Sequence, residues 1–362
     1  MLKLAALIVA VLAVVAVAAP ARFIGVHCFS VRSHPTERSA DLLRATANVK
    51  GYFRSASSTY LTLPEWYIVY SAEEYASFVK ARGPSRFPYF AAIQQYWRYY
   101  RLACGATKRV YPFNSGVHLM LGVIGVSFTT EYAIKGAYEN TVGRLSEWLG
   151  FYQTDEDVFA HKTAREYAEF MHMAPWYEFP FWSKLTGLWT GTPLWGPDPV
   201  RKWERRFALS AEYGTKAVYG RVIRWSSGTV YRPEDHVVHA WLDDVPEPVF
   251  ADSRVKRIKT LTARSYIVTL PRYEAFTQVV AALVKQGVRF LDFAGNDEIL
   301  LTAIAPRDWD YRLATGGLLF SDEILTNPAE KRIAVRAPVS SLHQILADLP
   351  SRGVTVEHLY DY

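Results

Sequence analysis

The residues best suited to chemistry lie between residues 156 and 173, where the sequence pattern predicts a helix. At about 100° per residue, four polar side chains fall within about 80° of one another: His161, Arg165, Glu169 and His172. A Glu-x-x-His pair such as Glu169 and His172 occurs in two copies in bundle di-metal sites, and this chain has one copy. His161, Glu169 and His172 are therefore candidate metal ligands. The competing interpretation is the solvated face of an amphipathic helix.

A second group of charges lies at the end of the apolar segment over residues 115–134. Glu131, Lys135 and Glu139 recur every four residues, so they share one side of a helix. Acidic side chains near a membrane are costly to bury and are often functional. In an enzyme that acts on a lipid-like substrate, Glu131, Glu139 and Glu169 would be the catalytic acids and bases. A helical ion pair between Glu131 and Lys135 is the structural alternative.

A third group consists of cations at the end of an aromatic stretch over residues 175–203. Trp, Tyr and Phe are frequent in this stretch, and such rings favour the boundary between membrane and water. The cations could bind anionic lipid headgroups at about 1 kcal/mol each: Arg201, Lys202, Arg205 and Arg206. The sequence therefore predicts an interfacial helical region over residues 151–250. The alternatives are an aromatic pocket or partner surface and a plain solvated helix start.

The chain carries no other strong site motif. It has no P-loop, dinucleotide-binding glycine pattern, Gly-x-Ser-x-Gly or His-Glu-x-x-His, so no cofactor and no cofactor-binding residue is identified. The run from Asp235 through His236 and His239 to Asp244 matches no strong metal motif. The net charge of +6 over 362 residues is a mild excess without the basic stripe of a nucleic-acid-binding protein. Two cysteines exclude a disulfide scaffold and a multi-cysteine zinc site.

Two apolar segments predict a membrane protein. Residues 4–19 carry no polar side chain, which indicates an uncleaved anchor or a cleaved signal peptide. Residues 115–134 are uncharged except for Glu131, and summed insertion energies of about −4 kcal/mol allow a second membrane helix. A buried core helix is the alternative. Gly122 and Gly125 would let another helix pack closely against this segment.

The charges that flank the second segment bear on its orientation. More cations precede this segment than follow it, which favours a cytoplasmic location for residues 30–113: Arg98, Arg101, Lys108 and Arg109 against Lys135 and Arg144. If residues 30–113 instead face an oxidising compartment, Cys28 and Cys104 could form a disulfide.

The C-terminal third changes to strands and short helices. Residues 265–270, 288–293 and 298–304 predict strands, and residues 273–286 predict a helix that ends at Gly287. A similar unit recurs without gaps: Ile267 aligns with Ile333, Leu283 with Leu349, Gly287 with Gly353 and Val288 with Val354. The pattern predicts a ferredoxin-like α/β sandwich, built from two β-α-β units over residues 255–362. This fold by itself specifies no function.

Together these patterns predict an α+β membrane protein whose N-terminal two-thirds are mainly helical, with one or two transmembrane helices. An anchor (residues 1–29) and an aromatic-rich helical loop region (30–113) precede a second transmembrane helix with an extension (114–150). A multi-pass protein of a bacterial inner membrane would have lipids, other membrane proteins or a second copy as partners, and no nucleic acid. Its expected role is binding, scaffolding or sensing at the membrane. The lipid-directed enzyme is the alternative.

Overall fold

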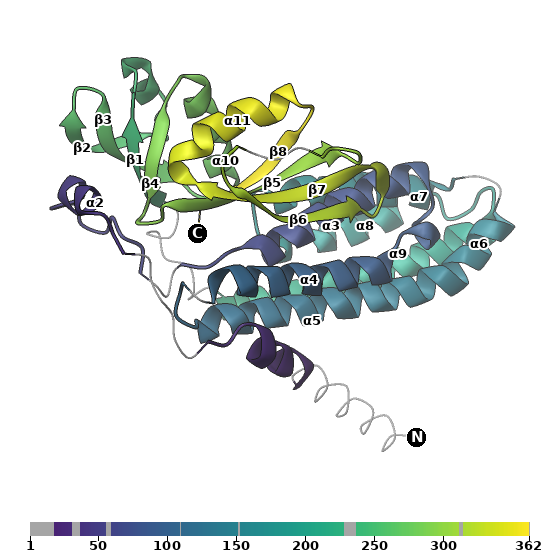
Figure 1. Cartoon of the computed structure of the whole chain (residues 1–362). Helices are drawn as coiled ribbons and strands as arrows, with labels where there is room; N and C mark the ends of the chain where they lie inside the picture. Colours follow the sequence, from purple (N-terminus) through teal and green to yellow (C-terminus); the bar gives the residue numbers. More distant parts are fainter. Residues whose placement is uncertain are drawn as a thin grey trace. The chain divides into compact units, whose positions relative to one another are not determined.

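The computed structural model describes residues 18–30, 37–55, 59–108, 110–150, 153–227, 237–310 and 314–361 (Figure 1). Helices and sheets are mixed, as the sequence predicts. The described residues divide into two compact units, one drawn from residues 1–64, 99–123 and 232–362 and the other from residues 65–98 and 124–231. Helices α4 (Tyr89–Thr107) and α5 (Ser115–Tyr138) contribute to both units. The predicted N-terminal anchor lies mostly outside the described residues, which begin with a helical stretch over residues 18–27.

The second unit, here called the helical unit, is a bundle. Besides parts of α4 and α5, it contains α3 (Leu63–Ala81), α6 (Arg144–Leu149), α7 (Asp155–Met171), α8 (Phe181–Gly191) and α9 (Pro199–Ser227). A π-helical turn over Glu139–Gly143 joins α5 to α6. A capping box starts α7: the Thr154 hydroxyl accepts from the Asp157 N–H, and the Asp157 carboxylate accepts from the Thr154 N–H.

One helix in the described part of the chain, Ser115–Leu149, is long and apolar enough to cross a membrane. Only 28% of its most apolar window is buried, whereas the core helix of a soluble protein is mostly buried. Leu119 and Ile134 are 68% and 65% exposed. Leu121 and Phe128 are buried, so the segment is partly covered by the protein's own side chains. Because this is the single helix in the described ranges that meets the criterion, a multi-pass arrangement is not supported.

Helix α5 approaches α4 closely where α5 carries a glycine. A Cβ atom placed on Gly125 would lie 2.4 Å from Cε1 of Tyr96 and 3.0 Å from the Trp97 ring. Tyr96 is fully buried, so its ring has little room to move. The prediction that Gly125 permits close helix packing is confirmed.

We expect Gly125→Ala to lower the free energy of unfolding by about 1–3 kcal/mol, because the added methyl group overpacks the α4–α5 contact. Denaturant titration of the detergent-purified chain measures the change. Gly105→Ala on α4 is the matched control, since nothing lies within 4 Å of its added Cβ. That control should gain about 0.5–1 kcal/mol from helix propensity. Equal effects of the two substitutions would contradict the packing argument.

The C-terminal part of the first unit contains two four-stranded antiparallel sheets (Figure 1), with strand orders β2-β3-β1-β4 and β6-β7-β5-β8. The first sheet and its helix comprise β1 (Val237–Asp243), β2 (Lys256–Thr262), β3 (Ser265–Pro271), α10 (Glu274–Lys285) and β4 (Arg289–Phe293). The second set comprises β5 (Glu298–Pro306), β6 (Gly317–Ile324), β7 (Asn327–Pro338), α11 (Leu342–Ser351) and β8 (Thr355–Tyr360). The domain is therefore a tandem repeat of one β-β-β-α-β unit. Buried residues of both sheets and both helices form one common core.

The aligned residues of the repeat perform the same task in both copies. Gly287 and Gly353 follow α10 and α11 with φ angles of 86° and 73°, a conformation that favours glycine. Val288 N–H donates to the Leu283 carbonyl, and Val354 N–H donates to the Leu349 carbonyl. Each helix thus ends in a Schellman motif that places an apolar pair against the core.

The predicted arrangement of the repeat needs a correction. The units β3-α10-β4 and β7-α11-β8 are present, but β1 or β5 lies between the two strands of each unit, which makes it a split β-α-β motif. The two units do not share one sheet, so a single ferredoxin-like sandwich is not what the described residues form. The edge strands β2 and β6 were not predicted, because neither sequence has the hydrophobic alternation of a strand and β2 is largely exposed.

Candidate functional site

Helices α5 and α9 run antiparallel and exchange charges along their contact. Glu131 binds Lys216 (2.8 Å), and Lys135 binds Glu212 (3.0 Å). Arg205 holds Glu139 with two hydrogen bonds of 2.8 and 3.1 Å. Glu131, Lys135 and Glu139 share one side of α5, as predicted, but their partners come from α9. The two predicted catalytic acids on α5 are therefore each bound by a cation.

The four cations that open α9 point into the bundle. Arg201, Lys202, Arg205 and Arg206 are 4%, 2%, 3% and 1% exposed. Arg201 binds Asp157 (2.7 Å), Lys202 binds Glu156 (3.0 Å), and Arg206 binds the same Glu156. These four charged side chains are buried, so a lipid headgroup at the surface of the helical unit would not contact them. The sequence could not reveal this, because the acids that draw the cations inward lie on the distant segments 139–157.

A cavity of about 480 Å³ lies inside the helical unit. Four of the predicted residues line it together: Glu139, His161, Arg201 and Arg205. Desolvation lowers the pKa of His161, and the nearby charges of Lys80 and Arg165 lower it further.

The other predicted metal ligands do not join His161. His172 Nε2 lies 2.6 Å from Glu73 of α3, while Glu169 is exposed beside Arg165 at 3.8 Å. Among the described residues, the one group that places three ligand atoms within reach of a metal ion is Cys28, Cys104 and His118. His161, Glu169 and His172 form no such group in this part of the chain.

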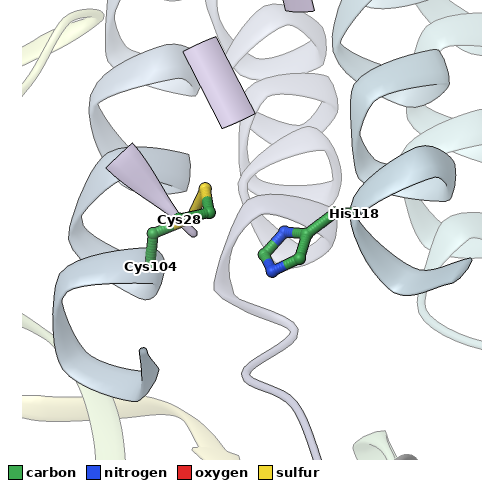
Figure 2. Close-up of side chains that lie close together, drawn as sticks. All are labelled: Cys28, Cys104 and His118. Atoms are coloured by element: carbon green, nitrogen blue, oxygen red, sulfur yellow. A yellow bond between two sulfur atoms is a disulfide. The ribbon is translucent and has the colours of Figure 1, made fainter. Parts of the chain in front are cut away.

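Cys28 and Cys104 form a disulfide, and the His118 ring lies beside it (Figure 2). Both cysteines are buried. His118 Nδ1 lies 3.1 Å from the Tyr100 hydroxyl, and its ring stacks on Phe113 at a centroid distance of 4.7 Å. This disulfide matches the oxidising-compartment alternative that the sequence left open.

The outer side of α9 is mainly apolar, with the exposed Arg221 near its C-terminal end, although its inner side is charged. Exposed apolar residues recur at intervals typical of one helix face: Val200, Trp203, Phe207, Val218, Val222 and Trp225. A helix at the surface of a soluble bundle has the opposite polarity, with charges outward. The helix is therefore arranged to present apolar side chains to its surroundings.

This apolar surface continues onto neighbouring helices of the same unit. The Phe207 ring lies 6.4 Å from Tyr138 of α5, and Trp203 lies 6.2 Å from both Trp189 of α8 and Trp195. On the α5–α6 side, the exposed residues are Ile134, Val142, Leu145, Trp148 and Leu149. We call the exposed apolar side chains of α5, α6, α8 and α9 within the helical unit the apolar face.

Three cavity residues escaped the sequence analysis. Lys80, Arg82 and Arg86 lie at the end of α3 and in the following turn, and all three are exposed. The sequence showed only scattered cations on either side of Gly83 and Pro84. Their signal was weak because the acids that complete the cavity come from α5, α6, α7 and α9.

Comparisons with protein-family models, curated proteins and solved structures give no match for this chain, so the function is argued from its own geometry.

Proposed function

We propose that this protein is a membrane-bound binding or assembly component whose helical unit rests on lipid through the apolar face. The observation that carries the proposal is the inverted polarity of α9, with Trp203 and Phe207 exposed while Arg205 and Arg206 are buried. Exposed apolar patches of this extent mark membrane or partner contacts. The tryptophans favour lipid, because indole rings are enriched at the headgroup level.

The surroundings of α5 favour a position along the membrane surface over one across it. In the first unit, Tyr100 of α4 contacts His118 of α5, and the adjacent Tyr99 packs on Phe320 of β6 at 4.6 Å. In the helical unit, α7 exposes Arg165 and Glu169, while Lys216 of α9 lies over the α7 ring of Tyr167 at 4.8 Å. If α5 crossed the membrane, these neighbouring residues would enter its hydrocarbon core. Insertion would then cost about 2.5–3.5 kcal/mol for each charged side chain. An in-plane amphipathic surface avoids that cost.

A binding role has more support than the lipid-directed enzyme. Glu131 and Glu139 each pair with a cation, and Glu169 is an exposed acid beside Arg165. An acid or base in catalysis needs a proton that it can exchange with substrate, and these carboxylates are committed to ion pairs. The repeated C-terminal domain gives the protein a second folded part that could serve as a docking or ligand-sensing module.

Flotation with phosphatidylcholine vesicles tests the membrane proposal. We expect the variant Trp203→Glu/Phe207→Glu to lose most vesicle binding, because each change places a charge at apolar lipid depth. Val158→Glu is the matched control, since Val158 is 53% exposed on the charged side of α7, in line with Lys162 and Arg165. Equal flotation of the double variant and the wild-type chain would remove the basis of the proposal.

A further inference from the structure

The cavity of the helical unit has an excess of positive charge at its mouth. Five cations line it against four carboxylates. The cations divide into two groups, since Arg201 and Arg205 are buried while Lys80, Arg82 and Arg86 are exposed. A ligand that enters from solvent would meet the exposed group first.

Every carboxylate in the cavity wall already has a cationic partner. Arg205 binds Glu139. Arg201 lies 2.7 Å from Asp157 and 3.5 Å from Glu147, and Glu147 also accepts from the Ser85 hydroxyl. The fourth carboxylate, Glu212, binds Lys135 and Lys216. Arg201 and Arg205 also share Glu204, and Lys216 also binds Glu131, so no cation at the floor of the cavity is left without an acid.

The three exposed cations at the mouth of the cavity have no carboxylate partner. Within the ranges that the structure describes, Lys80, Arg82 and Arg86 make no ion pair with a carboxylate. Burial lowers the pKa of His161 on the same wall, and the charge of Lys80 lowers it further. The capping box at the N-terminus of α7 already uses the N–H groups of Thr154 and Asp157, and the proposal does not rest on this helix end.

We propose that this cavity binds the phosphate group of a small anionic molecule, with Lys80, Arg82 and Arg86 as its cationic ligands. Three cations around one opening suit a dianion better than a single carboxylate, and guanidinium groups match the geometry of phosphate oxygens. A volume of about 480 Å³ leaves room for a polar group attached to the phosphate. Either a free phosphate ester or a phospholipid headgroup would supply this chemistry. The headgroup case rests on the proposed membrane function.

The test uses the detergent-purified full chain and two kinds of probe. Calorimetric titration with inorganic phosphate and with glycerol 3-phosphate measures binding of the free group. Flotation with vesicles of phosphatidylcholine, with and without added phosphatidic acid, measures binding of the headgroup. The variant Arg82→Gln/Arg86→Gln is compared with Lys162→Gln/Lys285→Gln, which removes two exposed cations outside both the cavity wall and the apolar face.

We expect Arg82→Gln/Arg86→Gln to weaken binding by about tenfold or more, because each lost bond to a charged group is worth at least that factor. The control variant should stay close to the wild-type value. Binding of the soluble probes would identify a free phosphate ester, and binding of phosphatidic acid vesicles alone would identify a headgroup. Binding of neither, or equal effects of the two variants, overturns the proposal. Flotation on pure phosphatidylcholine reports on the apolar face, so failure of the membrane proposal is seen separately.

Discussion

Replacement of Arg205 by alanine is expected to destabilise the helical unit by about 3–5 kcal/mol, as when one partner of a buried ion pair is removed. Arg205 is 3% exposed and binds Glu139 with both terminal nitrogens, and it also contacts Glu204. Its loss would leave Glu139 buried without its main cation. Thermal unfolding of the purified chain, followed by circular dichroism, measures the change.

The matched control is Arg165→Ala. Arg165 also binds a glutamate on the α-helical surface, Glu169, but the two side chains are 61% and 68% exposed. An exposed pair of this kind contributes about 0.3–0.5 kcal/mol. The double variant Arg205→Met/Glu139→Met should be less damaged than the sum of its single changes, because neither charge is left alone. Similar losses of stability for Arg205→Ala and Arg165→Ala would mean that the buried ion pair between Arg205 and Glu139 contributes little to stability.

Helix positions could be predicted from the sequence because the apolar period is local. The predicted helix over residues 156–173 corresponds to α7. Local spacing can also mislead: Ser71-Ala72-Glu73-Glu74 has the spacing of a capping box, yet α3 begins at Leu63. The Ser71 hydroxyl instead contacts the Tyr132 hydroxyl at 3.0 Å inside the bundle. Pro64 is tolerated because it lies in the first turn of the helix.

The side of each helix that faces the protein could not be predicted. For α9, an amphipathic pattern is compatible with either polarity, and the usual rule places charges outward. The rule fails here because Glu139, Glu156 and Asp157 meet the cations inside the bundle. A long-range pairing of this type leaves no local trace in the sequence, so Arg201 and Arg205 were assigned to a lipid surface.

The cavity could be predicted only in part for the same reason. Glu139, His161, Arg201 and Arg205 each stood out by residue type, yet they were placed in three different sites. The repeat in the C-terminal domain was easier to find, because Gly287 and Gly353 mark the same Schellman ends at the same spacing. The strand order of its two sheets could not be predicted. The first strand of each repeat, β1 or β5, lies between two strands that come later in the sequence.

Removal of the disulfide is the second change with a large expected effect. Cys28→Ser/Cys104→Ser should lower the free energy of unfolding by about 2–5 kcal/mol, because the cross-link restricts the unfolded chain over a long loop. The two cysteines are 76 residues apart and both are 2% exposed. A reductant should destabilise the wild-type chain by a similar amount and leave the double variant unchanged. A reductant effect on both proteins would show that the loss arises elsewhere.

The same bond leads to a prediction of the compartment in which the two cysteines lie. Disulfides persist in oxidising compartments, so residues 28–104 are expected outside the cytoplasm. The excess of cations before residue 115 favours the opposite side, but the positive-inside rule applies to helices that cross the membrane. If α5 lies along the surface, Arg98 and Arg101 carry no information about sidedness. Maleimide labelling of the denatured chain, isolated without reductant, should therefore modify neither cysteine, whereas labelling of both would place this region in a reducing compartment.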